Sequence, residues 1–355
     1  MRKDIVIIAS EQFGYNTATY YYCKYLCDKY HIIYIGWDHG LERINIKGVQ
    51  IEYLSRKGGR ALRLVNLIYT IFHYTSSKDT IIIIKYYWII SSIIRLLRYR
   101  NVILLDIRTA SVAPNVIIRY VQDIILKFEC KFFNNIGVIS ELLAKRLKIS
   151  DRAVILPLGA EIISYNNKKN NQLKLLYVGT LYNRNINQMV NGFIKFEKKY
   201  RTVIQMRLTI IGTGSKNEEI NIKKLITRAG LNKKINLLGR VPHNQLKKYF
   251  DAHNIGVAFI PMTRYYDTQP ATKIFEYLLS GIAVIATATS ENKKVINRLN
   301  GVLIQDTADD FFDGLKNITE RISDYNSEQI RKDALIYRWN NIVKNLSDYL
   351  IEITN

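Results

Sequence analysis

Apolar, β-branched runs alternate with longer stretches of helical periodicity along the whole chain. In the first half these runs predict strands at 5–9, 32–37, 80–84, 102–106, 135–139 and 154–156. The stretches between them predict helices at 16–29, 60–74, 88–99, 116–131 and 141–147. Because continuous apolar strands must be covered on both faces, this alternation predicts a parallel sheet with helices on either side.

A polar segment at 164–172 has no apolar periodicity, so it is predicted to be a linker. The alternation then restarts, with strands predicted at 174–178, 207–211, 235–238, 255–259, 283–286 and 301–304, and helices at 186–200, 218–229, 243–251, 271–280 and 308–319. At 355 residues the chain exceeds the size at which one core keeps growing. We therefore expect an α/β protein with an N-terminal domain over 1–163, a second doubly wound domain over 173–327, and further helices over 328–355.

The formal net charge of +22 needs an explanation, since 48% hydrophobic and 23% charged residues are ordinary for a folded protein. Three explanations of the charge compete: a nucleic-acid partner, an anionic membrane surface, or simply a composition rich in Lys, Ile and Asn. Basic residues are spread along the chain without a zinc-finger or RNP signature, so we expect no nucleic-acid partner. Apolar runs at 116–118 and 124–126, punctuated by Arg119 and Lys127, suit an anionic membrane surface. Buried helices with solvated charged edges explain them about equally well.

Neither a membrane span nor a metal site is predicted. The most apolar stretch, 81–97, is interrupted by Lys85 and Arg95, whereas a span needs about twenty apolar residues. The three cysteines form no even disulfide set, and the five histidines have no metal-ligand spacing. We expect a cytoplasmic protein, with a peripheral position on the inner face of the plasma membrane as an open alternative.

The segment from Asp267 to Thr287 carries the clearest candidate chemistry. Pro270 suits the first turn of a helix that follows a strand, where free N–H groups and the helix dipole can hold an anion. Lys273 adds a positive charge in that turn, and Glu276 lies near it on the helix surface. A diphosphate at the helix mouth and a ribose on the carboxylate would use these groups. An ordinary amphipathic helix with a solvated Glu–Lys pair is the competing interpretation.

This segment resembles glycosyltransferase family four, whose members have the GT-B fold and a helix of the form P-x-K-x-F-E-Y-x-x-x-G-x-x-V-I-A. The matching residues are Lys273, Phe275, Glu276, Tyr277, Gly281, Val284, Ile285 and Ala286, and Pro270 stands one position farther from Lys273 than in this form. The resemblance implies two Rossmann-like domains facing a central cleft, and ribose binding by Glu276. Thr268 stands where the family often has a second glutamate, which Asp267 could partly replace. Gln269 and Thr272, in the same segment, are further candidates for donor binding.

Glycine turns after two earlier strands agree with this resemblance. Gly179 directly follows a predicted strand, and Arg184 comes five residues later. Glycine lets the backbone approach a phosphate closely, and arginine can bond it through two N–H groups. Gly212 and Gly214 follow the next strand, although a tight strand-to-helix turn would also explain them.

The resemblance implies further contacts in both domains. The end of the third strand of the second domain would receive the nucleobase, with Arg240 and Val241 as candidates. In the first domain, Gly14 would approach the transferred sugar. Asp106 and Arg108 follow a strand end and are candidates for acceptor or donor contacts. A structural Asp–Arg pair is a slightly better explanation of those two. The last helices are expected to pack back on the N-terminal domain.

The function implied is that of a hexosyl-type glycosyltransferase (EC 2.4) of bacterial surface-polysaccharide synthesis, such as capsule or O-antigen assembly. It would move a sugar from a nucleotide-diphosphate sugar to a saccharide or lipid-linked saccharide, with retention. Lys273, Arg184 and the helix N-terminus would stabilise the leaving diphosphate, and Asp106 is the remaining catalytic candidate. No cofactor and no metal are expected, because cationic side chains and backbone dipoles take the metal's place.

Three alternatives compete with this function. A GT-B sugar-nucleotide epimerase would need acid–base pairs in the cleft, for which few histidines and carboxylates are available. A non-catalytic, basic, membrane-associated protein would account for the charge alone, but it would make no use of Glu276. A nicotinamide-dependent dehydrogenase is disfavoured, since no G-x-G-x-x-G follows the first strand.

Overall fold

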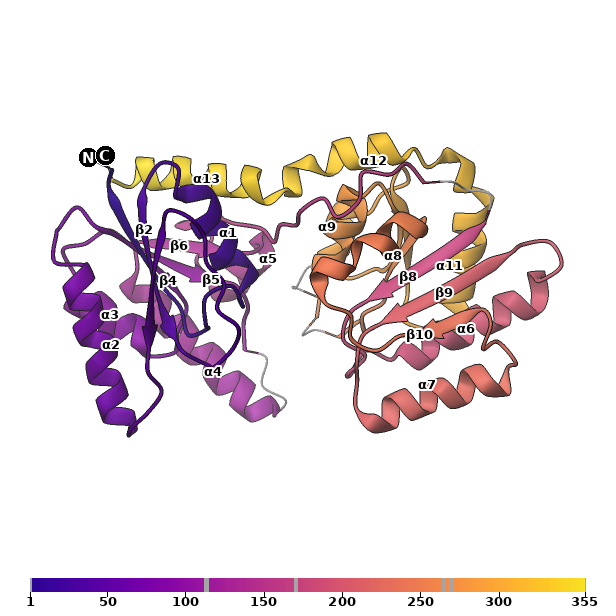
Figure 1. Ribbon diagram of the computed structural model, residues 1–355, viewed down its shortest axis with the longest axis horizontal. Coiled ribbons are helices and arrows are strands. Elements are labelled where there is room, and N and C mark those ends of the chain that lie inside the picture. The colour runs from indigo at the N-terminus through magenta and orange to yellow at the C-terminus, as the bar shows by residue number, and fades with distance from the viewer. Residues whose placement is uncertain (1, 112–114, 169–171, 264–265, 268–270, 355) are drawn as a thin grey trace. The chain divides into compact units, whose positions relative to one another are not determined.

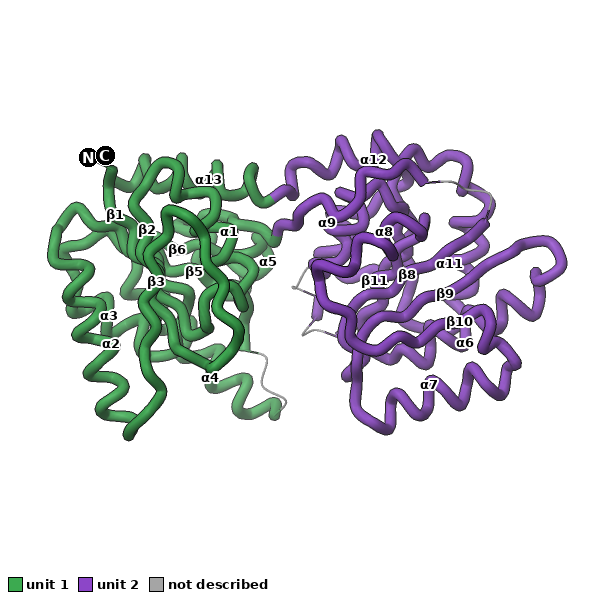
Figure 2. Tube along the Cα trace, in the orientation of Figure 1, with its two compact units in different colours: residues 1–158, 339–355 green, residues 159–338 purple. Residues whose placement is uncertain are grey.

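The computed structural model describes residues 2–111, 115–168, 172–263, 266–267 and 271–354 (Figure 1). The chain divides into two compact units, drawn in different colours in Figure 2. Unit 1 comprises Met1–Leu158 and Trp339–Asn355, and unit 2 comprises Gly159–Arg338. Residues 159–163 and 328–338, expected in the N-terminal domain and in the terminal helices, therefore group with unit 2.

Unit 1 contains a seven-stranded parallel sheet in the order β3-β2-β1-β4-β5-β6-β7. Its strands are β1 (Asp4–Ile8), β2 (His31–Trp37), β3 (Val49–Leu54), β4 (Ile81–Lys85), β5 (Ile103–Ile107), β6 (Asn135–Val138) and β7 (Ala153–Ile155). The chain leaves β1 for β2 and β3 on one side and then returns to β4 on the other. The reversal between β1 and β4 is a topological switch point, where open α/β sheets bind ligands.

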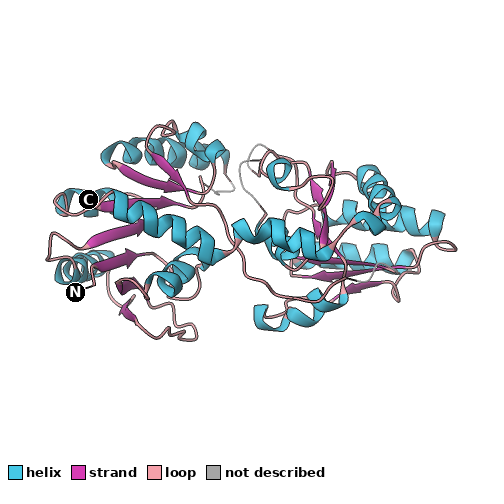
Figure 3. Ribbon diagram, turned by 90° about the horizontal axis from the view of Figure 1, so that it is seen from above, coloured by secondary structure: helices cyan, strands magenta, loops and turns pink. Residues whose placement is uncertain are grey.

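Helices cover both faces of this sheet (Figure 3). They are α1 (Thr17–Leu26), α2 (Arg60–Tyr74), α3 (Ile90–Leu97), α4 (Val116–Glu129), α5 (Glu141–Leu147) and α13 (Trp339–Glu352), with the 3-10 turn η1 (Cys130–Phe132). Successive side chains of a strand point to opposite faces. Ile5 and Ile7 accordingly share a core with α1 and α13, whereas Val6 and Ile8 share one with α2, α3, α4 and α5.

Strand β3 was not predicted from the sequence. Its residues alternate as Val-Gln-Ile-Glu-Tyr-Leu, and most of them are only half-buried. An edge strand pairs on one side only, so it lacks the continuous apolar run by which the other strands of this sheet were recognised. Pairing with β2, from Ile32–Val49 to Trp37–Leu54, is what makes the segment a strand.

Unit 2 contains a six-stranded parallel sheet in the order β10-β9-β8-β11-β12-β13. Its strands are β8 (Leu173–Val178), β9 (Met206–Ile211), β10 (Ile235–Leu237), β11 (Ile255–Ala258), β12 (Ala283–Thr287) and β13 (Gly301–Ile304), each at a position predicted from the sequence. The switch point of this sheet lies between β8 and β11. Ligands of such a sheet are therefore expected beside the segments that follow these two strands.

The helices of unit 2 are α6 (Ile186–Tyr200), α7 (Lys216–Arg228), α8 (Lys247–Ala252), α9 (Thr272–Leu279), α10 (Asn292–Val295), α11 (Ala308–Glu320) and α12 (Ser327–Asp333), and its 3-10 turns are η2 (His243–Gln245), η3 (Ile322–Asp324) and η4 (Ala334–Tyr337). The helix predicted at 243–251 thus forms as η2 followed by α8. Within the described parts of the chain, no helix combines the length and hydropathy that a membrane crossing requires.

Candidate nucleotide-binding site

Three glycines join the carboxyl ends of β8, β9 and β10 in unit 2. The Gly179 N–H donates to the Ile211 carbonyl (3.0 Å), and the Gly212 N–H donates to the Gly239 carbonyl (2.7 Å). A Cβ added at Gly212 would lie 1.7 Å from the Gly179 carbonyl oxygen, so only glycine fits there. The resulting turns are partly exposed and carry no side chains at these positions. Their backbone is therefore accessible to a close ligand such as a phosphate.

The loop after Gly179 presents a guanidinium. Arg184 lies between Asn183 and Asn185, whose φ values of 54° and 53° are ones that asparagine tolerates better than most residues. Its guanidinium carbon is 4.2 Å from the centroid of the Tyr266 ring. The Arg184 Nη1 atom is buried and has no hydrogen-bond partner among the residues that the structure describes. This arginine thus retains the donor capacity that an anionic ligand would use.

Helix α9 is tied to the end of β8 through Tyr277. The buried Tyr277 hydroxyl accepts a hydrogen bond of 2.9 Å from the Val178 N–H, the last residue before Gly179. Its ring stacks on Phe250 (centroids 5.4 Å apart) and passes so close to Gly256 of β11 that a Cβ there would lie 2.4 Å from it. The position of α9 against the Gly179 turn is therefore determined by packing inside unit 2.

Glu276 is the charged centre of this site. It is 7% exposed, and its two oxygens face two nitrogen donors: Oε2 lies 2.7 Å from the Lys273 Nζ, and Oε1 lies 3.5 Å from the His243 Nε2. Burial opposes ionisation of Glu276. The hydrogen bonds and charges of His243 and Lys273 outweigh that effect and lower the pKa of the carboxyl group. Glu276 is therefore an ionised hydrogen-bond acceptor at neutral pH.

The structure changes the interpretation of Lys273. Its ammonium group is bonded to Glu276 rather than standing alone at the start of α9. The competing interpretation, a solvated Glu–Lys pair on an ordinary amphipathic helix, does not hold either, because Glu276 is buried and Lys273 is mostly covered. His243, which completes the arrangement, was missed in the sequence. The available signal was its place two residues after Val241, in the loop that had been assigned to the nucleobase.

The G-x-G turn after β9 is held by the start of α7. Ser215 and Glu218 form a capping box, and the Gly214 N–H donates to Glu219 Oε1 (3.0 Å). Glu218 also accepts from the Asn183 N–H (2.9 Å), which links this turn to the Arg184 loop. Gly214 thus serves the turn geometry, and Glu218 links the two loops.

Other predicted contacts fall near the same edge of the sheet. Arg240 is exposed and Val241 half-buried, directly after Gly239. Thr272 is the first residue of α9 and is half-buried. Thr268 and Gln269, as well as Pro270, lie outside the described residues.

Asp267, which could partly replace the missing glutamate, already has two hydrogen-bond partners. Its carboxylate accepts from the Ser290 N–H and from the Ser290 hydroxyl, each at 2.7 Å. Both bonds hold the loop after β12. Because its oxygens have these partners, Asp267 is explained by loop structure without a ligand.

In unit 1, Gly14 lies in a turn, and Asp106 and Arg108 form a buried pair. Gly14 has a φ of 89°, and a Cβ there would lie 2.5 Å from Ile44. Asp106 is fully buried, with Oδ1 3.5 Å from Arg108 Nη1. Arg108 also donates to the Tyr22 hydroxyl (3.0 Å) and the Leu156 carbonyl (2.8 Å). This placement favours the structural pair over a substrate contact for Asp106 and Arg108.

The geometry of unit 2 thus combines accessible glycine turns, a guanidinium with free donors and a buried, ionised carboxylate beside the start of α9. Residues 160–332 match the family model described as glycosyl transferases group 1. Unit 2 belongs to this family. The match includes the segment from Lys273 to Ala286, on which the resemblance to glycosyltransferases was based, as well as Gly179 and Arg184.

Solved structures extend the likeness of fold to the whole chain. Sucrose-phosphate synthase from Thermosynechococcus elongatus is 16% identical, with 99% of both chains covered and a TM-score of 0.76. HepE of Anabaena, solved in complex with UDP, is 12% identical, with 99% of this chain and 100% of that chain covered and a TM-score of 0.74. The lipopolysaccharide outer core galactosyltransferase WaaB is 14% identical, with 98% and 99% covered and a TM-score of 0.72. Among curated proteins no match was found. The chain therefore has the GT-B fold.

Proposed function

We propose that this protein transfers a hexosyl group from a nucleotide-diphosphate sugar to a saccharide or lipid-linked saccharide, with retention, in bacterial surface-polysaccharide synthesis. The observation that carries the proposal is the buried, ionised Glu276 beside the glycine turns of a group 1 glycosyltransferase unit. A carboxylate in this state can accept two hydrogen bonds from neighbouring ribose hydroxyls. UDP is the first nucleotide to test, because HepE has been solved with it.

In the proposed reaction the acceptor hydroxyl oxygen bonds to the anomeric carbon while the bond from that carbon to the diphosphate oxygen breaks. The proton of the acceptor passes to the departing diphosphate, so no protein carboxylate has to act as a base. Arg184 and the free N–H groups at the start of α9 would stabilise the charge that develops on the diphosphate. Lys273 would contribute less than an isolated cation, since Glu276 neutralises it.

Binding of UDP to Glu276→Gln, measured by isothermal titration calorimetry, tests the donor site. A hydrogen bond to a charged group is worth about 1.5–3 kcal/mol, so we expect UDP affinity to fall roughly 10- to 100-fold. Glu320→Gln is the matched control, because Glu320 forms an exposed pair with Lys316 (3.9 Å) on α11. Equal UDP affinity in Glu276→Gln and Glu320→Gln would refute the assignment of Glu276.

The proposed acceptor side includes an anionic membrane surface. Helix α4 exposes a row of large apolar side chains, namely Val116, Ile117, Ile118, Tyr120, Val121, Ile124 and Phe128. Patches of this kind mark protein or membrane contacts. Arg119, Lys127 and Lys131 lie along the same segment, and positive charge beside apolar groups suits anionic lipid headgroups.

Cosedimentation with vesicles tests this contact. The wild-type protein should bind vesicles that contain phosphatidylglycerol more tightly than vesicles of phosphatidylcholine alone, and the difference should shrink as salt is added. Ile117→Ser together with Val121→Ser should weaken binding, whereas Val203→Ser, at an 81% exposed valine of unit 2, should not. Binding that is indifferent to lipid charge would contradict the proposal.

A further inference from the structure

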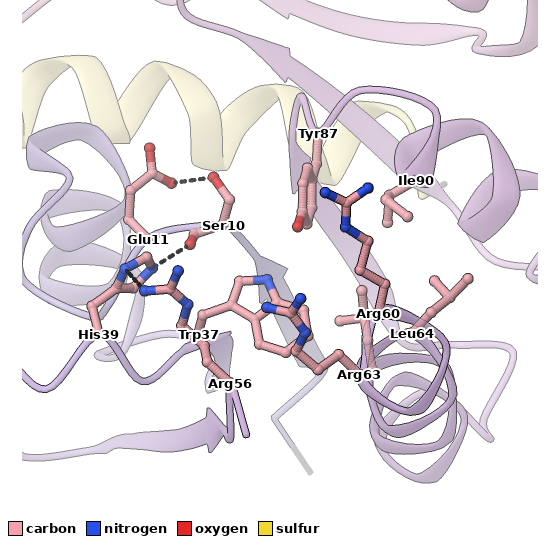
Figure 4. A pocket seen from close by; sticks show the side chains of 11 residues that line it. Ser10, Glu11, Trp37, His39, Arg56, Arg60, Arg63, Leu64, Tyr87 and Ile90 are labelled. Atoms are coloured by element: carbon pink, nitrogen blue, oxygen red, sulfur yellow. Dashed lines mark hydrogen bonds between the residues drawn. The ribbon is translucent and has the colours of Figure 1, made fainter. Parts of the chain in front are cut away.

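The proposed function does not use a basic pocket in unit 1. This pocket has a volume of about 600 Å³. It lies at the switch point of the seven-stranded sheet: Glu11 follows β1, His39 follows β2 and Tyr87 follows β4 (Figure 4). An open α/β sheet binds ligands at this edge, so position alone makes the pocket a candidate site.

Three arginines line the pocket. Arg56 comes from the loop after β3, and Arg60 and Arg63 come from the first turn of α2 (Figure 4). Arg56 donates to Nδ1 of His39 (3.1 Å), whose Nε2 faces the Ser10 carbonyl (3.0 Å). Neither Arg60 nor Arg63 forms an ion pair with any residue that the structure describes.

Among the described residues that line the pocket, no carboxylate is left to balance these charges. Glu11 is its acidic lining residue, and its carboxylate is bonded to Lys85 and to the Ser10 hydroxyl (3.1 Å). The pocket therefore presents a net positive charge from three guanidinium groups. Guanidinium groups bond phosphate and diphosphate oxygens in pairs, so such a cluster matches an anion with several oxygens.

The position of Arg60 and Arg63 costs helix stability. Both lie in the first turn of α2, which contains no acidic residue and has no side-chain cap on Gly59. The positive end of the helix dipole repels cations placed there. Local stability thus does not explain these two arginines, whereas an anionic ligand would.

The remaining lining of the pocket is apolar. Trp37, Leu64, Leu67, Tyr87 and Ile90 contribute to it. Aromatic and aliphatic walls beside a charged cluster favour a ligand whose anionic group is attached to a less polar body, rather than a free ion.

We infer that this pocket binds a phosphate or diphosphate group carried by the acceptor. The inference rests on the proposed function and deepens it, since it makes the acceptor a phosphorylated compound. Two sources share this chemistry: a lipid-linked diphosphate and a soluble sugar phosphate.

Binding of inorganic pyrophosphate to the full chain, measured calorimetrically with UDP at saturation, tests the inference. Saturating UDP occupies the donor site, so the remaining pyrophosphate binding reports the pocket. Arg60→Gln combined with Arg63→Gln should weaken that binding at least tenfold and leave UDP affinity unchanged. The matched control is Lys78→Gln with Arg100→Gln, two exposed basic residues that precede β4 and β5 and so lie at the opposite edge of the sheet.

Thermal unfolding separates a binding role from a structural one. Because the two arginines oppose the dipole of α2, the double variant should unfold at a temperature no lower than that of the wild-type protein. A lower unfolding temperature, or pyrophosphate binding equal to that of the control, would overturn the inference. Failure of the wild-type protein to bind UDP would instead count against the proposed donor site.

Two further ligands distinguish the sources of the phosphate. Farnesyl diphosphate represents the lipid-linked form and glucose 1-phosphate the soluble form. Tighter binding of farnesyl diphosphate, lost in the double variant, assigns the pocket to lipid-linked acceptors, whereas preference for glucose 1-phosphate assigns it to soluble ones. If neither ligand competes with pyrophosphate, the pocket holds an adventitious ion only and the inference is wrong.

Discussion

Replacing Tyr277 by phenylalanine removes one oxygen atom from the contact that holds α9 against β8. The ring remains, so its stacking on Phe250 and its approach to Gly256 are preserved and no cavity forms. The change leaves the buried Val178 N–H without its partner at 2.9 Å. An unsatisfied buried donor costs about 1–3 kcal/mol, and we expect the free energy of unfolding of unit 2 to fall by that amount.

Urea unfolding followed by far-ultraviolet circular dichroism measures this loss. The three tryptophans, Trp37, Trp88 and Trp339, all lie in unit 1, so tryptophan fluorescence reports that unit separately. We expect the loss in the circular dichroism transition without a matching shift in the fluorescence transition. Hydrogen exchange at the Val178 amide should become faster in the variant.

The control is Tyr182→Phe, which removes a hydroxyl from a side chain that is 57% exposed. It should change stability by less than about 0.5 kcal/mol. If Tyr277→Phe is as stable as Tyr182→Phe, the Val178 bond does not hold α9. The account of how the site is positioned would then be wrong.

The remaining predictions concern backbone, pH and metal. Gly212→Ala should destabilise unit 2 by several times more than Gly230→Ala. A Cβ at Gly212 (φ 152°) would meet the Gly179 carbonyl, whereas Gly230 also has a positive φ (68°) but open space around it. Equal losses in urea unfolding would contradict this. Burial lowers the pKa of His253 below its usual 6.5, despite its bond to the Tyr249 carbonyl. As the pH falls, the unfolded chain therefore protonates its His253 before the folded chain does. The stability that neutral His253 contributes above pH 6.5 should then be lost as the pH falls below 6.5. His253→Gln should make the free energy of unfolding less sensitive to pH below 6.5. Transfer activity should survive chelation by EDTA, and loss of activity that a divalent ion restores would refute a metal-free reaction.

Much of the donor site could be predicted from local sequence. Gly179 and Gly212 directly follow strands whose apolar runs are unmistakable, and the turns they form depend on backbone conformation close in the chain. The start of α9 and the spacing of Lys273 and Glu276 are also local, because residues three apart share a helix face. His243 could not be found in this way, since it reaches Glu276 from a loop 33 positions earlier in the chain.

The sequence by itself therefore determined the two sheets, the order of most elements and most segments of the candidate donor site. Hydrophobic periodicity and turn formation depend on residues close together in the chain, so the sequence alone reveals them. Only the tertiary structure decided which side chains pair: Glu276 with Lys273 and His243, and Glu11 with Lys85. It also brought Arg56, Arg60 and Arg63 together at the switch point of the first sheet, where the carboxylate of Glu11 is already bonded to Lys85. Ion pairing and burial depend on distance through space, and folding alone sets that distance.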